Sequence, residues 1–274
     1  RTVTRMEPLK EATAIKSEIS RVIASTAYQT YEKRLLKEVK ENEVPHHVAV
    51  IMDGNRRFAK EFGLTPAEGH IKGKDKLEEV LDWCMELGVK VLTVYAFSTE
   101  NFNRDESEVD SLMQMFEENF YRLAKDERVH RNGIRVRVLG QRDLLPDNVL
   151  KAIEVAESST AEYSNFHYNL ATAYGSRQEI LQAIKQIAQQ VKDGALEVED
   201  IDERTFSNFL YTADLPDPDL ILRTSGEERI SNFLLWQLAY SELYFTDVYW
   251  PGFRKIDLLR AIRSYQLRKR RFGK

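Results

Sequence analysis

Short apolar segments alternate with amphipathic segments along most of the chain. Segments such as VAVIM at 48–52 lack polar residues, which is typical of strands buried on both faces. Between them, apolar residues recur at helical spacing. We expect strands at 47–52, 90–96, 134–139, 166–173, 219–223 and 242–245. We expect helices at 55–62, 70–87, 107–129, 147–160, 176–192, 203–210 and 255–271.

This alternation predicts an α/β fold with a mainly parallel sheet covered by helices on both faces. No internal repeat or Pro/Gly-rich linker divides the chain, so we expect one domain over residues 45–274. Residues 8–42 combine helical periodicity with many charges and end before Pro45. We therefore expect residues 1–44 to form an N-terminal helical extension.

Composition excludes several classes of protein. A net charge of −4 in 274 residues gives no support for nucleic-acid binding. The longest apolar run, at 233–239, is too short to span a bilayer, and the start of the chain shows no secretory pattern. The single cysteine, Cys84, excludes an intrachain disulfide and lies on a helical pattern that predicts a buried thiol. We expect a cytoplasmic protein.

Two arginines and several hydroxyls surround a glycine after the strand expected at 219–223. They are Arg223, Thr224, Ser225, Gly226, Arg229 and Ser231. Arginines and free backbone N–H groups at the end of a strand suit an oxyanion such as phosphate. The alternative is an ordinary turn whose arginines pair with Glu227 and Glu228.

A second polar segment, DGNRR at 53–57, follows the strand at 47–52. Gly54 permits a tight turn and Asn55 can cap the next helix, so its first amides would face a ligand beyond the strand. Asp53 stands where a Mg²⁺ ligand would lie, because Mg²⁺ prefers one or two carboxylates together with phosphate oxygens. The alternative is a plain turn with Asp53 as the cap. Two such strand ends together indicate a diphosphate ester.

The loop after the strand at 90–96 is polar, and on its own it is typical of a turn. A weaker signal of the same kind is Gly175-Ser176-Arg177, and His70 opens the helix that follows the Asp53 segment. The chain has no zinc-ligand spacing, Ser–His–Asp arrangement, P-loop or dinucleotide fingerprint.

Together with the segments that flank them, these polar strand ends make the chain resemble the cis-prenyltransferases, which include undecaprenyl and dehydrodolichyl diphosphate synthases. The resemblance covers about residues 44–273 and rests on HVAVIMDGNRRFAK, Gly69-His70, VYAFSTENFNR, NLATAYGSRQEI, the long block that begins LILRTSGEERISNF, and Arg271-Phe272-Gly273. It implies one α/β domain with a six-stranded, mostly parallel sheet, different from the Rossmann fold, with a hydrophobic tunnel for the growing chain. Family members usually form dimers.

The resemblance also implies roles for individual residues. Asp53 corresponds to the catalytic aspartate that engages Mg²⁺, and Glu242 to a glutamate near that metal. Asn55, Ser98 and Asn101 correspond to catalytic residues. The remaining substrate-binding residues are Gly54, Arg56, Arg57, Phe58, His70, Phe97, Phe102, Arg104, Glu108, Arg223, Arg229 and Ser231. Among these, Arg57 and the amides after Gly54 would bind the allylic diphosphate, whereas Arg223, Arg229 and Ser231 would bind isopentenyl diphosphate.

The implied reaction condenses isopentenyl diphosphate with an allylic prenyl diphosphate. The allylic diphosphate departs, the isopentenyl double bond attacks the cation, and loss of a proton leaves a cis double bond. The resemblance implies a homodimer with Mg²⁺ as cofactor, a lipid product that partitions to the membrane, and a peripheral position of the enzyme there. Two alternatives are irregular coupling of prenyl diphosphates on the same fold and a non-catalytic subunit of a heteromeric enzyme.

Two features bear on specificity. Pro66 stands where most family members have an arginine that holds the allylic diphosphate, which puts the allylic site in question. The helix at 107–129 carries apolar residues at helical spacing, and we expect it to line the tunnel. Phe116 and Phe120 on this helix would limit the product to a length below that of the bacterial cell-wall carrier.

Overall fold

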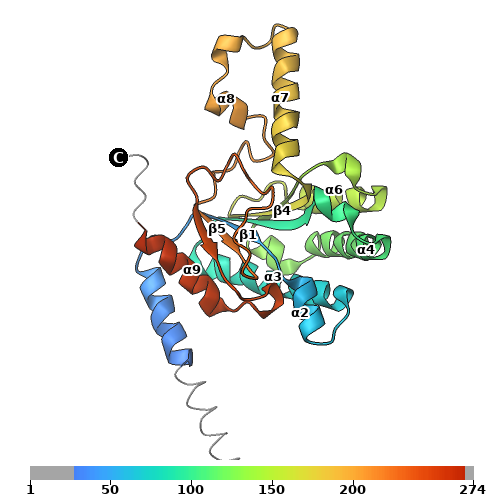
Figure 1. The fold of residues 1–274 in the computed structure, drawn as a ribbon. Helices are drawn as coiled ribbons and strands as arrows, with labels where there is room; N and C mark the ends of the chain where they lie inside the picture. The colour runs from blue at the N-terminus through green and yellow to red at the C-terminus, as the bar shows by residue number, and fades with distance from the viewer. Residues whose placement is uncertain (1–27, 269–274) are drawn as a thin grey trace, which may run out of the picture.

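The computed structural model describes residues 28–268, which contain one six-stranded sheet (Figure 1). The strands are β1 (His47–Ile51), β2 (Val91–Ser98), β3 (Ile134–Leu139), β4 (Phe166–Tyr174), β5 (Leu220–Arg223) and β6 (Glu242–Phe245). Their order is β3-β4-β2-β1-β5-β6, and every pairing is parallel. The structure therefore confirms a single α/β domain with a parallel sheet.

The helices follow the predicted pattern, apart from their ends and from one expected helix that is divided in two. They are α2 (Asn55–Glu61), α3 (Pro66–Leu87), α4 (Glu106–Leu123), α5 (Glu127–Arg131), α6 (Asp147–Thr160), α7 (Ser176–Lys192), α8 (Glu203–Ser207) and α9 (Lys255–Leu267). The single helix expected at 107–129 is two helices, because the Asp126 side chain caps α5 by accepting from the Arg128 N–H. Helix α3 begins four residues earlier than expected, at Pro66, after a capping box of Thr65 and Glu68.

Two apolar clusters cover the two faces of the sheet. Alternate residues of β1 divide between them: Val48 and Val50 belong to the larger cluster, and Ala49 and Ile51 to the smaller one. The larger cluster includes residues of α3, α4, α6 and α9, whereas the smaller one includes residues of the segment 224–241. Both faces of the sheet are thus buried, as the uninterrupted apolar segments predicted.

The described part of the N-terminal extension belongs to this core. Residues 28–40 are helical, and Leu35 and Val39 lie buried in the larger cluster. Gln266 of α9 donates to the Val39 carbonyl over 2.9 Å. The predicted boundary at residue 44 therefore does not separate two cores. The expected helix at 8–27 and the block Arg271-Phe272-Gly273 lie outside the described residues.

The segment from α7 to α8 projects from the sheet as a hairpin (Figure 1). Several of its apolar residues face outward: Leu181, Ile184, Val198 and Ile201 are exposed. Cys84, in contrast, is fully buried, and burial raises the pKa of its thiol to about 12. Within residues 28–268, no helix is both long and apolar enough to cross a bilayer.

The parallel sheet brings the two polar strand ends together. In the register of β1 and β5, Ile51 pairs with Arg223, so the residues that follow both strands meet at one edge. Gly54 turns the chain away from β1 with φ 106°, and a Cβ there would lie 2.9 Å from the Tyr249 ring. The tight turn therefore requires glycine.

Candidate active site

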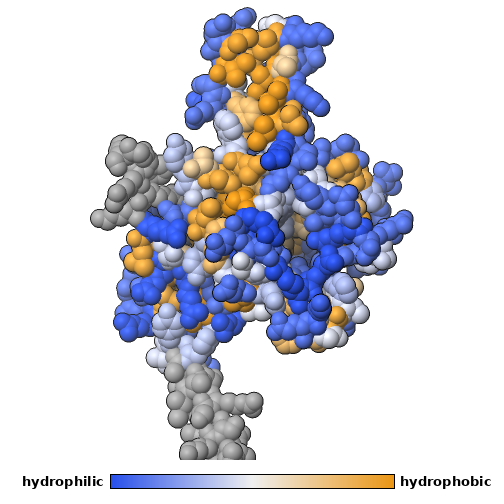
Figure 2. Space-filling model, viewed as in Figure 1, coloured by the Kyte–Doolittle hydropathy of each residue, from blue (hydrophilic) through white to orange (hydrophobic). Residues whose placement is uncertain are grey.

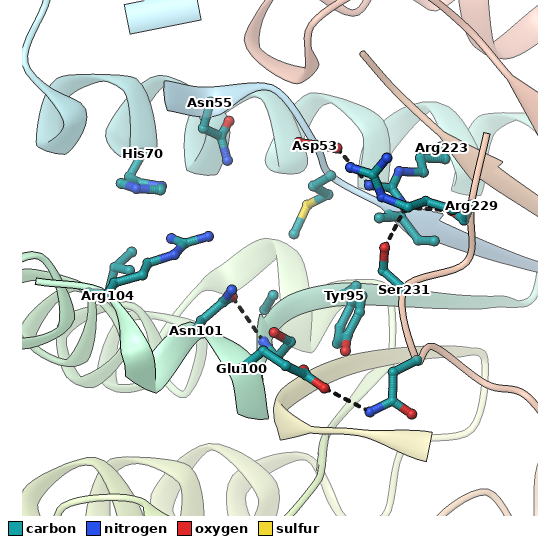
Figure 3. Close-up of a pocket in the computed structure, with 16 residues that line it drawn as sticks. Asp53, Asn55, His70, Tyr95, Glu100, Asn101, Arg104, Arg223, Arg229 and Ser231 are labelled. Atoms are coloured by element: carbon teal, nitrogen blue, oxygen red, sulfur yellow. Dashed lines mark hydrogen bonds and ion pairs between the residues drawn. The ribbon is translucent and has the colours of Figure 1, made fainter. Parts of the chain in front are cut away.

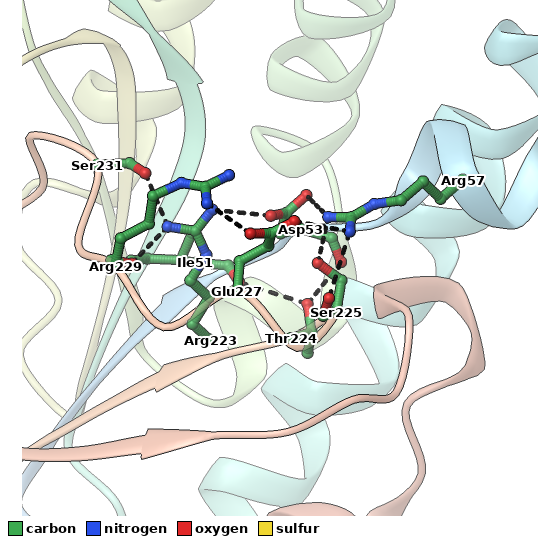
Figure 4. Close-up of polar contacts among 9 residues, drawn as sticks. All are labelled: Ile51, Asp53, Arg57, Arg223, Thr224, Ser225, Glu227, Arg229 and Ser231. Carbon is green, nitrogen blue, oxygen red and sulfur yellow. Dashed lines mark hydrogen bonds and ion pairs between the residues drawn. The ribbon is translucent and has the colours of Figure 1, made fainter.

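Asp53 lies between two arginines at the junction of β1, α2 and β5 (Figure 4). Its Oδ2 accepts a hydrogen bond from Arg223 Nη2 over 2.8 Å, and its Oδ1 lies 3.1 Å from Arg57 Nη2. Thr224 Oγ1 donates to the Asp53 carbonyl over 2.6 Å. The carboxylate therefore has a fixed place among groups from three separate elements.

The two arginines keep Asp53 ionised. Burial alone would raise the pKa of this carboxyl, but the hydrogen bonds and charges of Arg223 and Arg57 outweigh it and lower the pKa below the ordinary value. Because the group is ionised above its pKa, Asp53 carries a negative charge at neutral and mildly acidic pH.

Arg223 also organises the segment after β5. The Arg223 side chain is only 5% exposed. Its Nη1 donates to Ser231 Oγ over 2.7 Å and to the Arg229 carbonyl. Arg229 is 61% exposed and pairs with Glu227, which lies 3.0 Å from Arg57 as well. The alternative of an ordinary turn whose arginines pair with nearby glutamates therefore holds for Arg229. It does not hold for Arg223, which pairs with Asp53 at the end of the neighbouring strand.

Two cavities of about 550 and 540 Å³ meet at Asp53. Both are also lined by Asn55, His70 and Arg104. In the first cavity, His70 and Arg104 lie on one side and the arginines of the 223–231 segment on the other (Figure 3). The cationic side chains of the two cavities are Arg104, Arg223 and Arg229 in the first and Arg56, Arg57, Lys60 and Arg104 in the second.

Glu108 contacts His70 and Arg104, which lie across the first cavity from the arginines of the 223–231 segment. Its Oε1 lies 3.1 Å from His70 Nε2 and accepts from Arg104 Nη1 over 3.0 Å. Burial lowers the pKa of His70, and the positive charges of Arg104 and Arg56 lower it further. The hydrogen bond and the charge of Glu108 raise this pKa, but they do not outweigh the other effects. His70 is therefore neutral at pH 7, which leaves it able to donate one ring N–H and accept at the other nitrogen.

The turn after β2 presents polar side chains to the first cavity. Asn101 Oδ1 accepts from the Ser98 N–H over 3.0 Å, and both residues line the cavity. The expectation that Asn55 caps α2 is wrong, because Gly54 occupies the N-cap and makes no side-chain bond. Asn55 Oδ1 is instead a buried acceptor without a hydrogen-bond partner, in a side chain that lines the cavities.

Three aromatic residues expected to contact substrate pack elsewhere. Phe58 stacks on Phe62, with ring centroids 4.5 Å apart. Phe97 is buried in the larger cluster against Phe102, with centroids 4.8 Å apart. None of the three lines either of the two charged cavities, so they support the site from behind.

Glu242 lies away from Asp53 within one chain. It begins β6 and pairs in register with Leu220, the first residue of β5, whereas Asp53 follows the last residue of β1. The two carboxylates are thus at opposite edges of the sheet, and Glu242 forms an ion pair of 2.7 Å with Arg268. The expected pair of Asp53 and Glu242 on one metal ion is not formed within a single chain.

The donor set at Asp53 fits a metal ion held mainly by substrate. No group of three or more His, Cys, Asp or Glu side chains within residues 28–268 is arranged to hold a metal. Mg²⁺ needs only one or two carboxylates when phosphate oxygens and water complete its shell. Asp53 alone therefore suits Mg²⁺ together with a bound diphosphate.

Several residues around the cavities were not predicted. They are Lys60, Tyr95, Glu100 and Asn232. Lys60 follows Arg56 by four residues, so helical spacing was a usable signal for that residue. Asn232 follows Ser231 directly, but its contacts are to residues distant in sequence, and no local pattern indicates them.

A family model described as "Putative undecaprenyl diphosphate synthase" matches residues 51–273. The chain belongs to this family, the cis-prenyltransferases. Over 254 residues it is 58% identical to a tritrans,polycis-undecaprenyl-diphosphate synthase (geranylgeranyl-diphosphate specific) from Methanopyrus kandleri, which covers 93% of this chain and 94% of the relative. A synthase of the same name from Thermococcus kodakarensis is 55% identical over 258 residues, or 94% of this chain and 98% of the relative.

A solved structure is similar to this chain in both fold and sequence. Lavandulyl diphosphate synthase from Lavandula x intermedia, in complex with dimethylallyl diphosphate, is 40% identical with a TM-score of 0.79, covering 84% of this chain and 99% of that one. These findings confirm the predicted family and activity. The cis-prenyltransferase condenses isopentenyl diphosphate with an allylic prenyl diphosphate, and it is an enzyme rather than a non-catalytic subunit.

We predict that Asp53→Ala lowers turnover by at least about a hundredfold, because it removes the one carboxylate at which the two charged cavities meet. Incorporation of labelled isopentenyl diphosphate into lipid measures this. Asp82→Ala is the matched control, because Asp82 pairs with Arg128 away from both cavities and is half-exposed. Near-normal turnover in folded Asp53→Ala protein would contradict the assignment.

Proposed function

We propose that this cis-prenyltransferase extends geranylgeranyl diphosphate by successive cis additions of isopentenyl diphosphate, up to an undecaprenyl product. The observation that carries the proposal is the pair of arginine-rich cavities that meet at Asp53, since two diphosphates must lie close together for condensation. The primer and the product length follow the names of the two archaeal relatives. This product is longer than the sequence alone suggested.

The first cavity binds isopentenyl diphosphate in this proposal. Arg223, Arg229 and Ser231 lie on its wall, and Arg223 already holds Ser231 in place. Arginine side chains can bind phosphate oxygens with two parallel hydrogen bonds. A bound diphosphate would therefore compete with Asp53 and Glu227 for the N–H groups of Arg223 and Arg229. Asn55, Ser98 and Asn101 at the same cavity keep the catalytic roles that the family resemblance implies.

The second cavity binds the allylic diphosphate. Arg57 and the first residues of α2 line it, which is consistent with the anion-binding interpretation of DGNRR. Pro66 lines the same cavity and offers no charge, but Arg56 and Lys60 line it too. We assign to these two cations the part that arginine at position 66 plays in other family members, so the site keeps its affinity for diphosphate.

The prenyl chain lies between α3 and α4. A narrow apolar cavity of about 60 Å³, lined by Leu77, Leu112 and Phe116 among others, continues from the first cavity past His70. A groove of about 460 Å³ between the same helices opens to solvent. Phe116 lines the narrow cavity, whereas Phe120 is fully buried in the core and lines none of these spaces. Of the two, Phe116 alone is placed to meet the growing chain.

Mg²⁺ is the proposed cofactor, held by Asp53 and diphosphate oxygens. When bound, it would offset the charge of the departing diphosphate. We further propose a cytoplasmic location with peripheral contact to the membrane, because the charged substrates come from water and the lipid product leaves the site for the membrane.

The proposed homodimer uses the α7–α8 hairpin. Leu181, Ile184 and Val198 of this hairpin are between 49% and 61% exposed, and Figure 2 shows apolar surface gathered on the hairpin. A row of large apolar side chains on a projecting element is typical of a covered interface. A second copy of this chain suits it, because family members form dimers.

We predict that geranylgeranyl diphosphate is the best primer and that the product reaches undecaprenyl length. Parallel incubations with dimethylallyl, geranyl, farnesyl and geranylgeranyl diphosphates, labelled isopentenyl diphosphate and Mg²⁺, followed by chromatography of the lipids, test this. A clear preference for the dimethylallyl primer, or a product with a single added unit, would overturn it. In the same assay Phe116→Ala should lengthen the product, because it enlarges the narrow cavity.

We predict that Leu181→Glu combined with Ile184→Glu converts the dimer to monomers, because charged side chains cannot be buried unpaired in an apolar interface. Light scattering after size-exclusion chromatography measures the mass. Val155→Glu is the control, since Val155 is also exposed, at 43%, but lies on α6, whose buried residues belong to the larger cluster. A dimer that persists in the double variant would place the interface elsewhere.

A further inference from the structure

The segment that carries Arg229 and Ser231 lacks regular secondary structure. Between β5 and β6 the chain forms turns, and Ser231 and Asn232 both have positive φ, of 51° and 62°. Left-handed backbone is costly for residues other than glycine and is best tolerated by asparagine and aspartate. Tertiary contacts must therefore hold these two residues in place.

Asn232 supplies these contacts at the start of α7. Its carbonyl accepts from the Ser176 N–H over 2.8 Å, and its Oδ1 accepts from the Arg177 N–H over 2.8 Å. These are the first two amides of α7, which otherwise have no partner in their own helix. The weaker polar signal at Gly175-Ser176-Arg177 thus has a structural explanation, because Asn232 binds the first two amides of α7.

The same side chain reaches the turn after β2. Asn232 Nδ2 donates to Glu100 Oε1 and to Gln178 Oε1, each over 3.0 Å. Glu100 follows Ser98 by two residues and precedes Asn101, and it lines the first cavity (Figure 3). Asn232 thus joins the Arg229–Ser231 segment to the turn after β2, which also lines that cavity, through a single side chain.

Gly175 gives an independent sign that this junction is closely packed. Its φ is −154°, so backbone strain does not require glycine there. A Cβ at this position, however, would lie 2.2 Å from Gln178 Oε1, 2.8 Å from Asn232 Nδ2 and 2.8 Å from Thr99 Oγ1. The absence of a side chain at residue 175 leaves the space in which Asn232 makes its contacts.

We propose that Asn232 is a positioning residue for isopentenyl diphosphate: it fixes Arg229 and Ser231 at a set distance from the Ser98–Asn101 turn. The proposal rests on the assignment of the first cavity to isopentenyl diphosphate. Asn232 itself needs no contact with substrate, since it acts through Ser231 on one side and Glu100 on the other.

Three variants separate the side-chain contacts from other effects. Asn232→Gly removes the amide but accepts positive φ without strain. Asn232→Asp keeps an acceptor for the Arg177 N–H, loses both donated bonds and places a second carboxylate beside Glu100. Gly175→Ala leaves Asn232 intact and displaces it sterically. Asn148→Ala is the control, because the exposed Asn148 donates to Glu117 and neither residue lines the two charged cavities.

Two measurements test the proposal in folded variants, as judged by circular dichroism. Calorimetric titration with isopentenyl diphosphate, without primer, measures that site directly and does not require turnover. We expect its Kd to rise at least about tenfold in all three variants, because a small displacement of binding groups has a large effect. In steady-state assays, the KM for isopentenyl diphosphate should rise likewise, with the KM for the allylic primer within about twofold of wild type.

Wild-type affinity for isopentenyl diphosphate in folded Asn232→Gly and Gly175→Ala would overturn the proposal. A parallel rise in both KM values would also contradict it, because a general loosening of the structure does not separate the two substrates. A wrong primer or product length would be seen in the chromatographic assay with the wild-type enzyme. That failure is therefore distinguishable from a failure of the role proposed for Asn232.

Discussion

The ion pairs of Asp53 with Arg57 and Arg223 are the interaction on which the site depends. Arg57 lies only four residues after Asp53, whereas the pair with Arg223 joins the ends of β1 and β5 across 170 residues of sequence. Without a ligand, each guanidinium has a carboxylate partner, so the buried Arg223 is not left as an uncompensated charge. In the proposed function, bound diphosphates replace Asp53 as the anionic partners of these arginines, and Asp53 becomes free to contact a cation.

The sheet and the apolar core make this arrangement possible. Both faces of the sheet are buried, so the strands are held rigidly and their polar ends meet at one edge. Charged groups line the two cavities at that edge, whereas Leu112 and Phe116 of α4 form an apolar wall close behind them. In the proposed function, the two diphosphates lie side by side in these cavities and their hydrocarbon chains lie in the apolar space, which is the arrangement that prenyl condensation requires.

Sequence patterns predicted those parts of the molecule that depend on neighbouring residues. Strand periodicity located β1 and β5, and parallel pairing then placed Asp53 beside Arg223. The family resemblance named Glu242 as a metal ligand, although the strand expected at 242–245 already placed Glu242 at the start of a strand, whereas Asp53 follows the end of one. The role of Asn232 was hidden, because its hydrogen bonds join segments more than 50 residues apart. Packing of residues 28–40 into the core also depends on a distant partner, α9.

The most direct test of the account is calorimetric titration of inorganic diphosphate into wild-type and Asp53→Asn protein, each with and without Mg²⁺. Asparagine leaves Arg223 without a competing carboxylate, leaves Arg57 with Glu227 alone, and removes the metal ligand. The account predicts that, without Mg²⁺, the variant binds diphosphate more tightly than the wild type does. It also predicts that Mg²⁺ strengthens binding to the wild type much more than to the variant. Equal affinities and an equal response to Mg²⁺ would contradict it.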